Sequence, residues 1–147
     1  MNSDDDLIAA ASAPTEVKAA AAFVTLGGLF VALTGLQVIS VNWHDEWRNL
    51  APYLFLGIGG LMVPTGAILY RGNPKAALLG LILCTFAMFG TCGWFMGTWG
   101  SVFSLMNIAA VPMAVIGAVL CGLSVPATRK MAAARERLAD EGLNLGF

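Results

Sequence analysis

The chain has 147 residues, of which 58% are hydrophobic and only 12% are charged, and its formal net charge is −1 at pH 7. A soluble domain of this length usually devotes about a quarter of its residues to charged side chains. The composition therefore excludes an ordinary soluble globular domain.

Long tracts of the chain contain no Asp, Glu, Lys or Arg. These tracts are 19–43, 49–70 and 76–128. A helix of roughly 20 residues crosses the hydrocarbon core of a bilayer once, so the first two tracts each predict one span. The third tract must cross twice, and we expect its break at 96–101, where glycines and small polar residues interrupt the large aliphatic ones. The sequence thus predicts four transmembrane spans, at approximately 19–41, 51–70, 76–96 and 102–124.

The predicted fold is an all-α bundle of four transmembrane helices, 19–124, between a cytoplasmic N-terminal segment, 1–18, and a cytoplasmic C-terminal helix and tail, 125–147. The chain turns polar after Pro126, which indicates a short amphipathic helix. Its apolar face carries Met131, Ala134 and Leu138. We expect this helix to lie on anionic headgroups, to contact a partner protein, or to stay solvated and partly docked.

The distribution of cations predicts the orientation. With four spans, the N-terminus, the second loop and the C-terminus lie on one side, and every Lys and Arg except Arg48 falls there. Because cytoplasmic flanks carry the excess of Lys and Arg, we expect both termini on the cytoplasmic side, of the inner membrane if the source is bacterial. Indole rings settle at headgroup level, and every Trp falls at the predicted outer interface. These residues are Trp43, Trp47, Trp94 and Trp99.

Small residues recur at helical spacing along the last two predicted spans. In lipid, apolar surface alone does not drive helices together, so close packing at small residues has to contribute. The fourth span carries Ala110, Ala114, Ala118 and Gly122. The third span carries a similar stripe that includes Gly80 and Cys84. Helices joined by a tight turn generally pack antiparallel, and we therefore expect these two faces to meet.

Polar side chains gather in the outer half of the predicted bundle. They include Thr34, Gln37, Ser104 and Asn107. Polar groups without partners are costly in hydrocarbon. We therefore expect these side chains either to hydrogen-bond across helices and fix their register, or to line a polar pocket.

The predicted outer loop, Trp43–Trp47, contains the only histidine of the chain. Its candidate residues are His44, Asp45 and Glu46, which are side-chain types that bind divalent metals. Three adjacent residues seldom converge on one ion, and a usual site needs three or four ligands. We therefore predict no metal and no cofactor for this loop.

The predicted spans lack the residues on which much membrane chemistry depends. They contain no Asp, Glu, Lys or Arg, which argues against a proton-coupled or ion-coupled transporter. A single histidine cannot supply both axial ligands of a bis-histidine haem. The chain also has no Cys-x-x-Cys pair, phosphate loop or nucleophile elbow. These absences predict a protein without catalytic activity.

The sequence therefore favours an accessory or structural subunit of a larger membrane complex, or a homo-oligomer. Its expected partners are the lipid bilayer and other membrane subunits or further copies of itself, with no nucleic acid. The alternative is a small channel or facilitator for a neutral solute or lipid, lined by the outer polar residues. A third reading is a metal or redox site on the outer loop.

Overall fold

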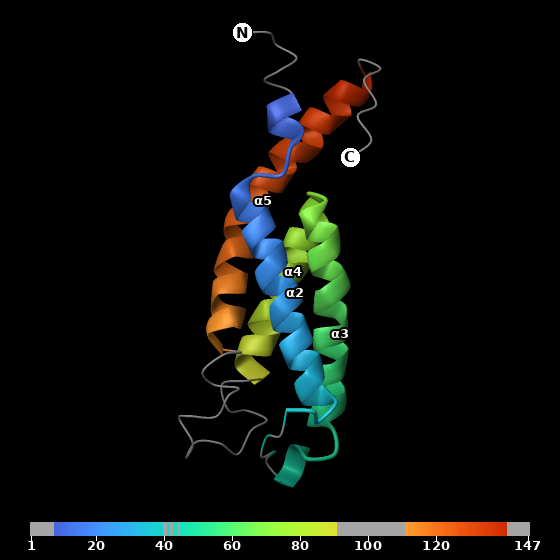
Figure 1. Cartoon of the computed structure of the whole chain (residues 1–147), viewed down its shortest axis with the longest axis vertical. Helices are drawn as coiled ribbons and strands as arrows, with labels where there is room; N and C mark the ends of the chain where they lie inside the picture. The colour runs from blue at the N-terminus through green and yellow to red at the C-terminus, as the bar shows by residue number, and fades with distance from the viewer. Residues whose placement is uncertain (1–7, 40, 42, 44, 91–110, 141–147) are drawn as a thin grey trace.

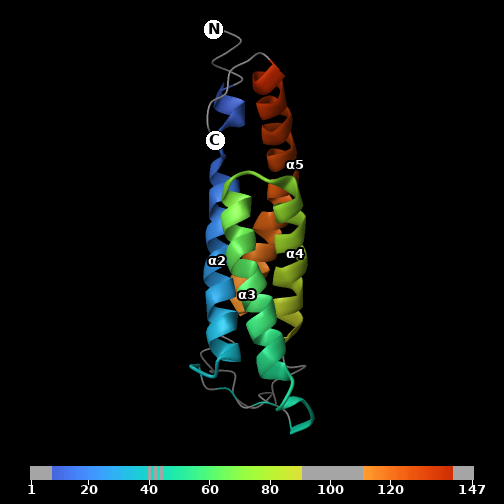
Figure 2. The same cartoon turned by 90° about the vertical axis from the view of Figure 1, so that its right-hand side faces the viewer.

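The computed structural model describes residues 8–39, 41, 43, 45–90 and 111–140. Within these ranges the chain is helical and forms an elongated bundle (Figures 1 and 2). The elements are α2 (Thr15–Gly35), the short 3-10 helix η1 (Asp45–Trp47), α3 (Ala51–Tyr70), α4 (Pro74–Phe89) and α5 (Val111–Asp140). For the described residues, the predicted all-helical class and the predicted number of long helices are confirmed.

Three helical stretches are long and apolar enough to cross a membrane, judged by length and composition. They are Ile8–Gly35, Ala51–Tyr70 and Val111–Asp140. α3 has the bounds predicted for the second span. α4 is apolar but has 16 residues, which cover about 24 Å at about 1.5 Å per residue. Residues 91–96 of the predicted span 76–96 and the predicted break at 96–101 lie outside the described residues.

α2 ends at Gly35, before the end of the predicted span, because Gln37 takes a left-handed conformation with φ 58°. The Gln37 N–H donates to the Thr34 carbonyl oxygen at 2.9 Å. The next N–H, that of Val38, donates to the Leu33 carbonyl oxygen at 3.0 Å. This pair of bonds is a Schellman motif, which satisfies carbonyl groups at the end of a helix. Glycine usually occupies the left-handed position, so a glutamine there gives no sequence signal that the helix ends.

α5 is one continuous helix of 30 residues, which corrects the predicted separation of a fourth span from a C-terminal helix. Pro126 lies inside this helix and removes one backbone donor. That single loss does not end the helix, because the residues after Pro126 are mostly alanines and long side chains of high helix propensity. At about 1.5 Å per residue, α5 is about 45 Å long, which exceeds a hydrocarbon core of about 30 Å.

The C-terminal part of α5 packs on the rest of the chain at the end where both described termini lie (Figure 1). The predicted apolar face is confirmed, since Met131, Ala134 and Leu138 are buried. Ala11 packs with Ala134 and Leu138, and Gly72 of the α3–α4 turn lies against Met131. The apolar face of this helix is therefore covered by the chain itself.

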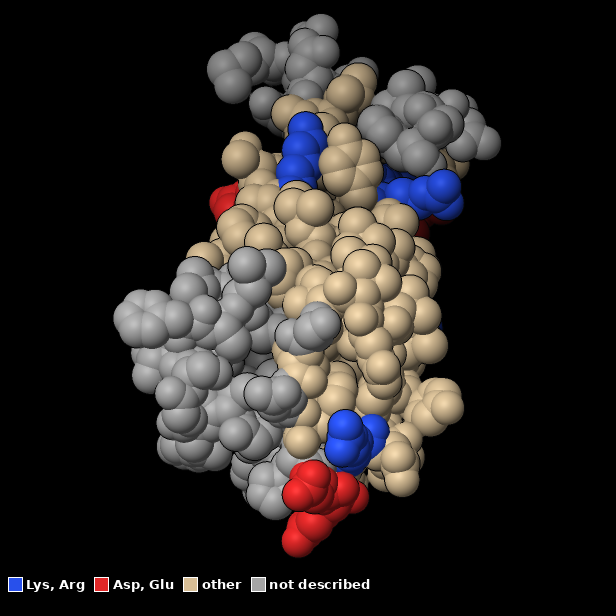
Figure 3. Space-filling view, turned by 60° about the horizontal axis from the view of Figure 1, so that its bottom comes forward, with Lys and Arg blue, Asp and Glu red and all other residues tan. Residues whose placement is uncertain are grey.

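Charged side chains gather at the two ends of the bundle, and the described surface between them is uncharged on the face shown in Figure 3. We call one of these ends the basic end. It carries the cations Lys18, Arg71, Lys75, Arg129, Lys130, Arg135 and Arg137 and the acids Glu16, Glu136 and Asp140. The opposite end carries Asp45, Glu46 and Arg48, in and beside η1. The start of α2, the α3–α4 turn and the end of α5 thus share one end, as the four-span arrangement predicts.

α2 and α3 approach each other closely at glycines. A Cβ atom on Gly28 would lie 2.6 Å from the Cβ atom of Met62. A Cβ atom on Gly59 would collide with the backbone of Ala32, and one on Gly35 with the backbone of α3. Only residues without a side chain permit this separation of the two helices.

Candidate functional site

Two residues of the predicted outer polar pocket, Thr34 and Gln37, belong to the described residues, whereas Ser104 and Asn107 lie outside them. The Thr34 side chain is buried, and its hydroxyl donates to the Phe30 carbonyl oxygen of the same helix at 2.9 Å. Gln37 is exposed in the turn that closes α2. One of these residues is therefore buried in the bundle and the other is exposed on its surface.

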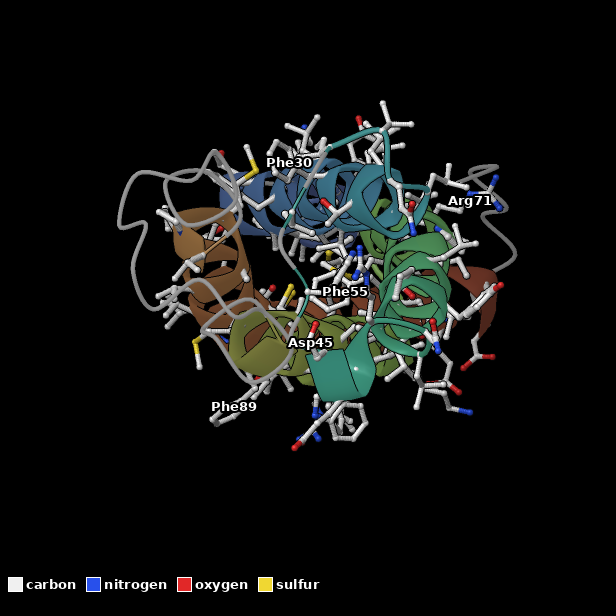
Figure 4. All side chains as sticks on the ribbon, turned by 90° about the horizontal axis from the view of Figure 1, so that it is seen from below. Phe30, Asp45, Phe55, Arg71 and Phe89 are labelled. Carbon is white, nitrogen blue, oxygen red and sulfur yellow. The ribbon has the colours of Figure 1, made fainter. Side chains whose placement is uncertain are left out.

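The outer-loop candidates Asp45 and Glu46 are exposed on η1, and His44 lies outside the described residues. Across the part of the chain that is described, no group of three or more His, Cys, Asp or Glu side chains is placed to hold a metal ion. The loop is anchored through Trp43, whose ring packs edge-to-face on Phe55 with ring centroids 5.1 Å apart. Figure 4, which looks along the bundle from this end, shows Phe55 among the helices. Such an aromatic contact contributes about 0.5–1.5 kcal/mol beyond its buried area.

The predicted contact between the third and fourth spans is present between α4 and α5. A Cβ atom on Gly80 would lie 3.0 Å from the Cys121 sulfur, and one on Gly117 would lie 3.0 Å from the Cys84 sulfur. Both cysteines are fully buried. Each thiol thus fills the space that a glycine of the facing helix leaves open, and this reciprocal pair holds the two helices in register.

The face of α5 that meets α4 differs from the predicted stripe. Ala114 is buried, but Ala118 is only half-buried and Gly122 is exposed, with nothing within 4 Å of its Cβ position. Ala110 lies outside the described residues. Steps of four residues advance about 400° around a helix, so such a stripe turns away from its partner by about 40° per step. The buried small residues instead alternate steps of three and four, which keeps them on one face. They are Ala114, Gly117, Cys121 and Ser124.

A second smooth face on α3 points away from the bundle, and the sequence prediction missed it. We call it the outer face of α3. It consists of the exposed residues Tyr53, Gly57, Gly60, Pro64 and Ala67. These positions alternate steps of four and three, which is the spacing of a helix–helix contact. A Cβ atom on Gly57 or Gly60 would meet nothing within 4 Å. The signal is present in the sequence, but it is interleaved with the glycines that face α2.

No known protein family, curated protein or solved structure matches the chain. Its function therefore has to be inferred from the chemistry and arrangement of its residues. Two surfaces of the described residues are considered below: the outer face of α3, with its exposed glycines, and the basic end, with its cluster of Lys and Arg side chains.

Proposed function

We propose that the chain is a non-catalytic, multi-pass integral membrane protein that binds a transmembrane helix of another protein or of a second copy of itself. It would then act as an accessory or structural subunit of a larger membrane complex, or as a homo-oligomer. The observation that supports this function best is the outer face of α3, where exposed glycines follow the spacing of a helix–helix contact.

The exposed glycines are unfavourable for the bundle by itself. A glycine inside a helix costs roughly 0.5–1 kcal/mol relative to alanine. Gly57 and Gly60 make room for no other part of the described chain, whereas Gly59 of the same helix lets α2 approach. A partner helix seated on the outer face would give Gly57 and Gly60 the role that Gly59 already has.

Pro64 also affects the hydrogen bonding of a backbone carbonyl group on the outer face of α3. It lies inside α3 and has no N–H, so it cannot donate to the carbonyl oxygen of Gly60, one turn earlier. Backbone carbonyls without a donor are costly in hydrocarbon. A partner helix that presents a hydroxyl or amide donor opposite Gly60 would both fill the smooth surface and supply this bond.

The distribution of charged residues predicts how the chain is oriented in the membrane. The helices carry no Asp, Glu, Lys or Arg between Ala19 and Gly35 or between Ala51 and Tyr70, and the cations gather at the basic end. Because Lys and Arg are enriched on the cytoplasmic side of membrane proteins, we place the basic end, with both termini, in the cytoplasm.

The test is the mass and composition of the particle extracted in mild detergent or in native nanodiscs. We expect a particle heavier than a single 15.4 kDa chain with its lipid or detergent. Other membrane proteins in stoichiometric amount would identify an accessory subunit, and further copies of the chain alone would identify a homo-oligomer. The double variant Gly57→Leu with Gly60→Leu should release a single chain, because leucine side chains hold a partner backbone away.

The matched control is Gly122→Leu, which adds the same side chain at an exposed glycine of α5 that has open space around it. This control should keep the assembly. A single chain from the unmodified protein, or an assembly that survives the double variant, would contradict the proposal. Flux of a neutral solute in liposomes, lost in Gln37→Leu and Asn107→Leu, would instead support a small channel or facilitator.

A further inference from the structure

An apolar groove of about 530 Å³ opens between α2 and α3 near the basic end. Its walls include the small residues Ala21, Ala22, Gly66 and Ala67. Because these side chains are short, they leave open a space that larger residues would fill. Lys18 and Arg71 line the end of the groove at the point where the uncharged parts of α2 and α3 stop. In a bilayer, this end of the groove would lie at the level of the headgroups.

A second hollow, of about 560 Å³, shares Arg71 with the groove and lies between the α3–α4 turn and α5. We call it the basic hollow, because Arg71, Lys75 and Arg135 line it and, among the residues that the structure describes, no Asp or Glu does. The Arg135 guanidinium is held in place, since it donates to the carbonyl oxygens of Arg71 at 2.5 Å and Ala11 at 3.2 Å. α4 also begins here, and the N-terminus of a helix carries a partial positive charge.

We propose that the groove and the basic hollow together bind one anionic phospholipid, with an acyl chain in the groove and the phosphate between Lys18 and Arg71. The basic hollow then takes a second negative charge of the same headgroup, at Lys75 and Arg135. Basic pockets between transmembrane helices bind headgroups of this kind. Guanidinium groups suit phosphate because their paired N–H groups match two of its oxygens.

The apolar groove favours a lipid over a soluble anion. A free phosphate needs only the cations and gains nothing from the apolar groove, whereas an acyl chain packs against the groove walls, which include alanines and Leu26. The inference rests on the membrane placement proposed above but needs no protein partner. Ala67 belongs to both the groove and the outer face of α3, but Arg71 and Lys75 belong only to the lipid site and Gly57 and Gly60 only to the outer face. Variants at these residues therefore test lipid binding and protein assembly separately.

The test is titration of the delipidated protein in detergent with defined lipids, read by native mass spectrometry. We expect diphosphatidylglycerol, with two phosphates, to bind more tightly than phosphatidylglycerol, with one, and both to bind more tightly than zwitterionic phosphatidylcholine. Each basic side chain near a headgroup contributes about fivefold in affinity. Arg71→Gln should therefore weaken both anionic lipids by about fivefold, and Lys75→Gln should weaken mainly the two-phosphate lipid.

The charge control is Arg129→Gln, which removes one cation from the basic end but lines neither hollow, and which should leave affinity unchanged. Arg71→Gln keeps the backbone carbonyl that Arg135 binds, and circular dichroism of each variant checks that it folds. Ala22→Leu fills the groove, so it should weaken all lipids while leaving the binding of inorganic pyrophosphate unaltered.

Three results would overturn the proposal. One is equal affinity for anionic and zwitterionic lipids. Another is an equal loss in Arg129→Gln and Arg71→Gln, which would indicate diffuse charge attraction in place of a site. The third is unaltered lipid binding in Ala22→Leu together with displacement of the lipid by pyrophosphate, which would identify a soluble anion as the ligand.

Discussion

Replacing Gly59 by alanine should push α2 and α3 apart and destabilise the bundle by about 3 kcal/mol. The added Cβ atom would lie 2.8 Å from the Ala32 Cα atom and 2.5 Å from the Gly28 carbonyl oxygen. Non-bonded carbon atoms rest about 3.5–4.0 Å apart, so α2 has to retreat by about 1 Å. Overpacking a tight interior costs about 1–3 kcal/mol, and the upper end applies here because both obstacles are backbone atoms that cannot rotate aside.

The assay is unfolding of the purified protein in mixed micelles with increasing denaturing detergent, followed by circular dichroism and by tryptophan fluorescence. Gly122→Ala is the matched control, because the same methyl group enters open space on α5. The control should leave the free energy of unfolding unchanged or raise it by up to about 1 kcal/mol through helix propensity. Equal stability of Gly59→Ala and the unmodified protein would refute the close α2–α3 contact.

Substitutions at two further positions test the ends of the bundle. Gln37→Gly should raise the free energy of unfolding by about 1 kcal/mol, because glycine adopts the left-handed conformation at φ 58° without strain. Gln37→Val should lower the free energy of unfolding, because a β-branched side chain is strained there. A destabilised Gln37→Gly variant in the same assay would contradict the Schellman motif at the end of α2. Arg135→Gln should release the N-terminal segment, because it removes the charged donors that bind the carbonyl oxygens of Ala11 and Arg71. A hydrogen bond from a charged donor contributes about 1.5–3 kcal/mol when buried, and less at this half-exposed position. Hydrogen exchange of residues 8–14 should then become faster, and unchanged protection would show that Arg135 does not anchor them.

The boundaries of α3 could be predicted because charged residues and a proline near its start delimit a tract of the right length. The end of α2 could not be predicted, because Gln37 takes the left-handed conformation that is usually occupied by glycine. A glutamine in the sequence does not indicate that conformation. The continuity of α5 was not predicted either, because proline usually ends a helix. In α5 the high helix propensity of the residues around Pro126 compensates for its unfavourable effect.

The candidate sites show a similar limit. The pairing of α4 with α5 was predicted from the short turn expected between them. The register of this contact was not predicted, because alanines and glycines occur on several faces of α5 and their spacing alone does not select one face. The glycines of α3 serve two surfaces, and composition cannot separate Gly59, which meets α2, from Gly57 and Gly60, which do not. The basic end joins residues far apart in the chain, such as Lys18 and Arg71, and only the packing of α2 on α3 brings them to one groove.

The most direct test of lateral association is site-specific photo-crosslinking in the native membrane, with a photoreactive side chain at Gly60 and, separately, at Gly122. A helix seated on the outer face of α3 predicts a discrete protein adduct from position 60, of the mass of a partner or of a second chain, and no such adduct from position 122. Adducts with lipid alone at both positions would contradict the proposed function.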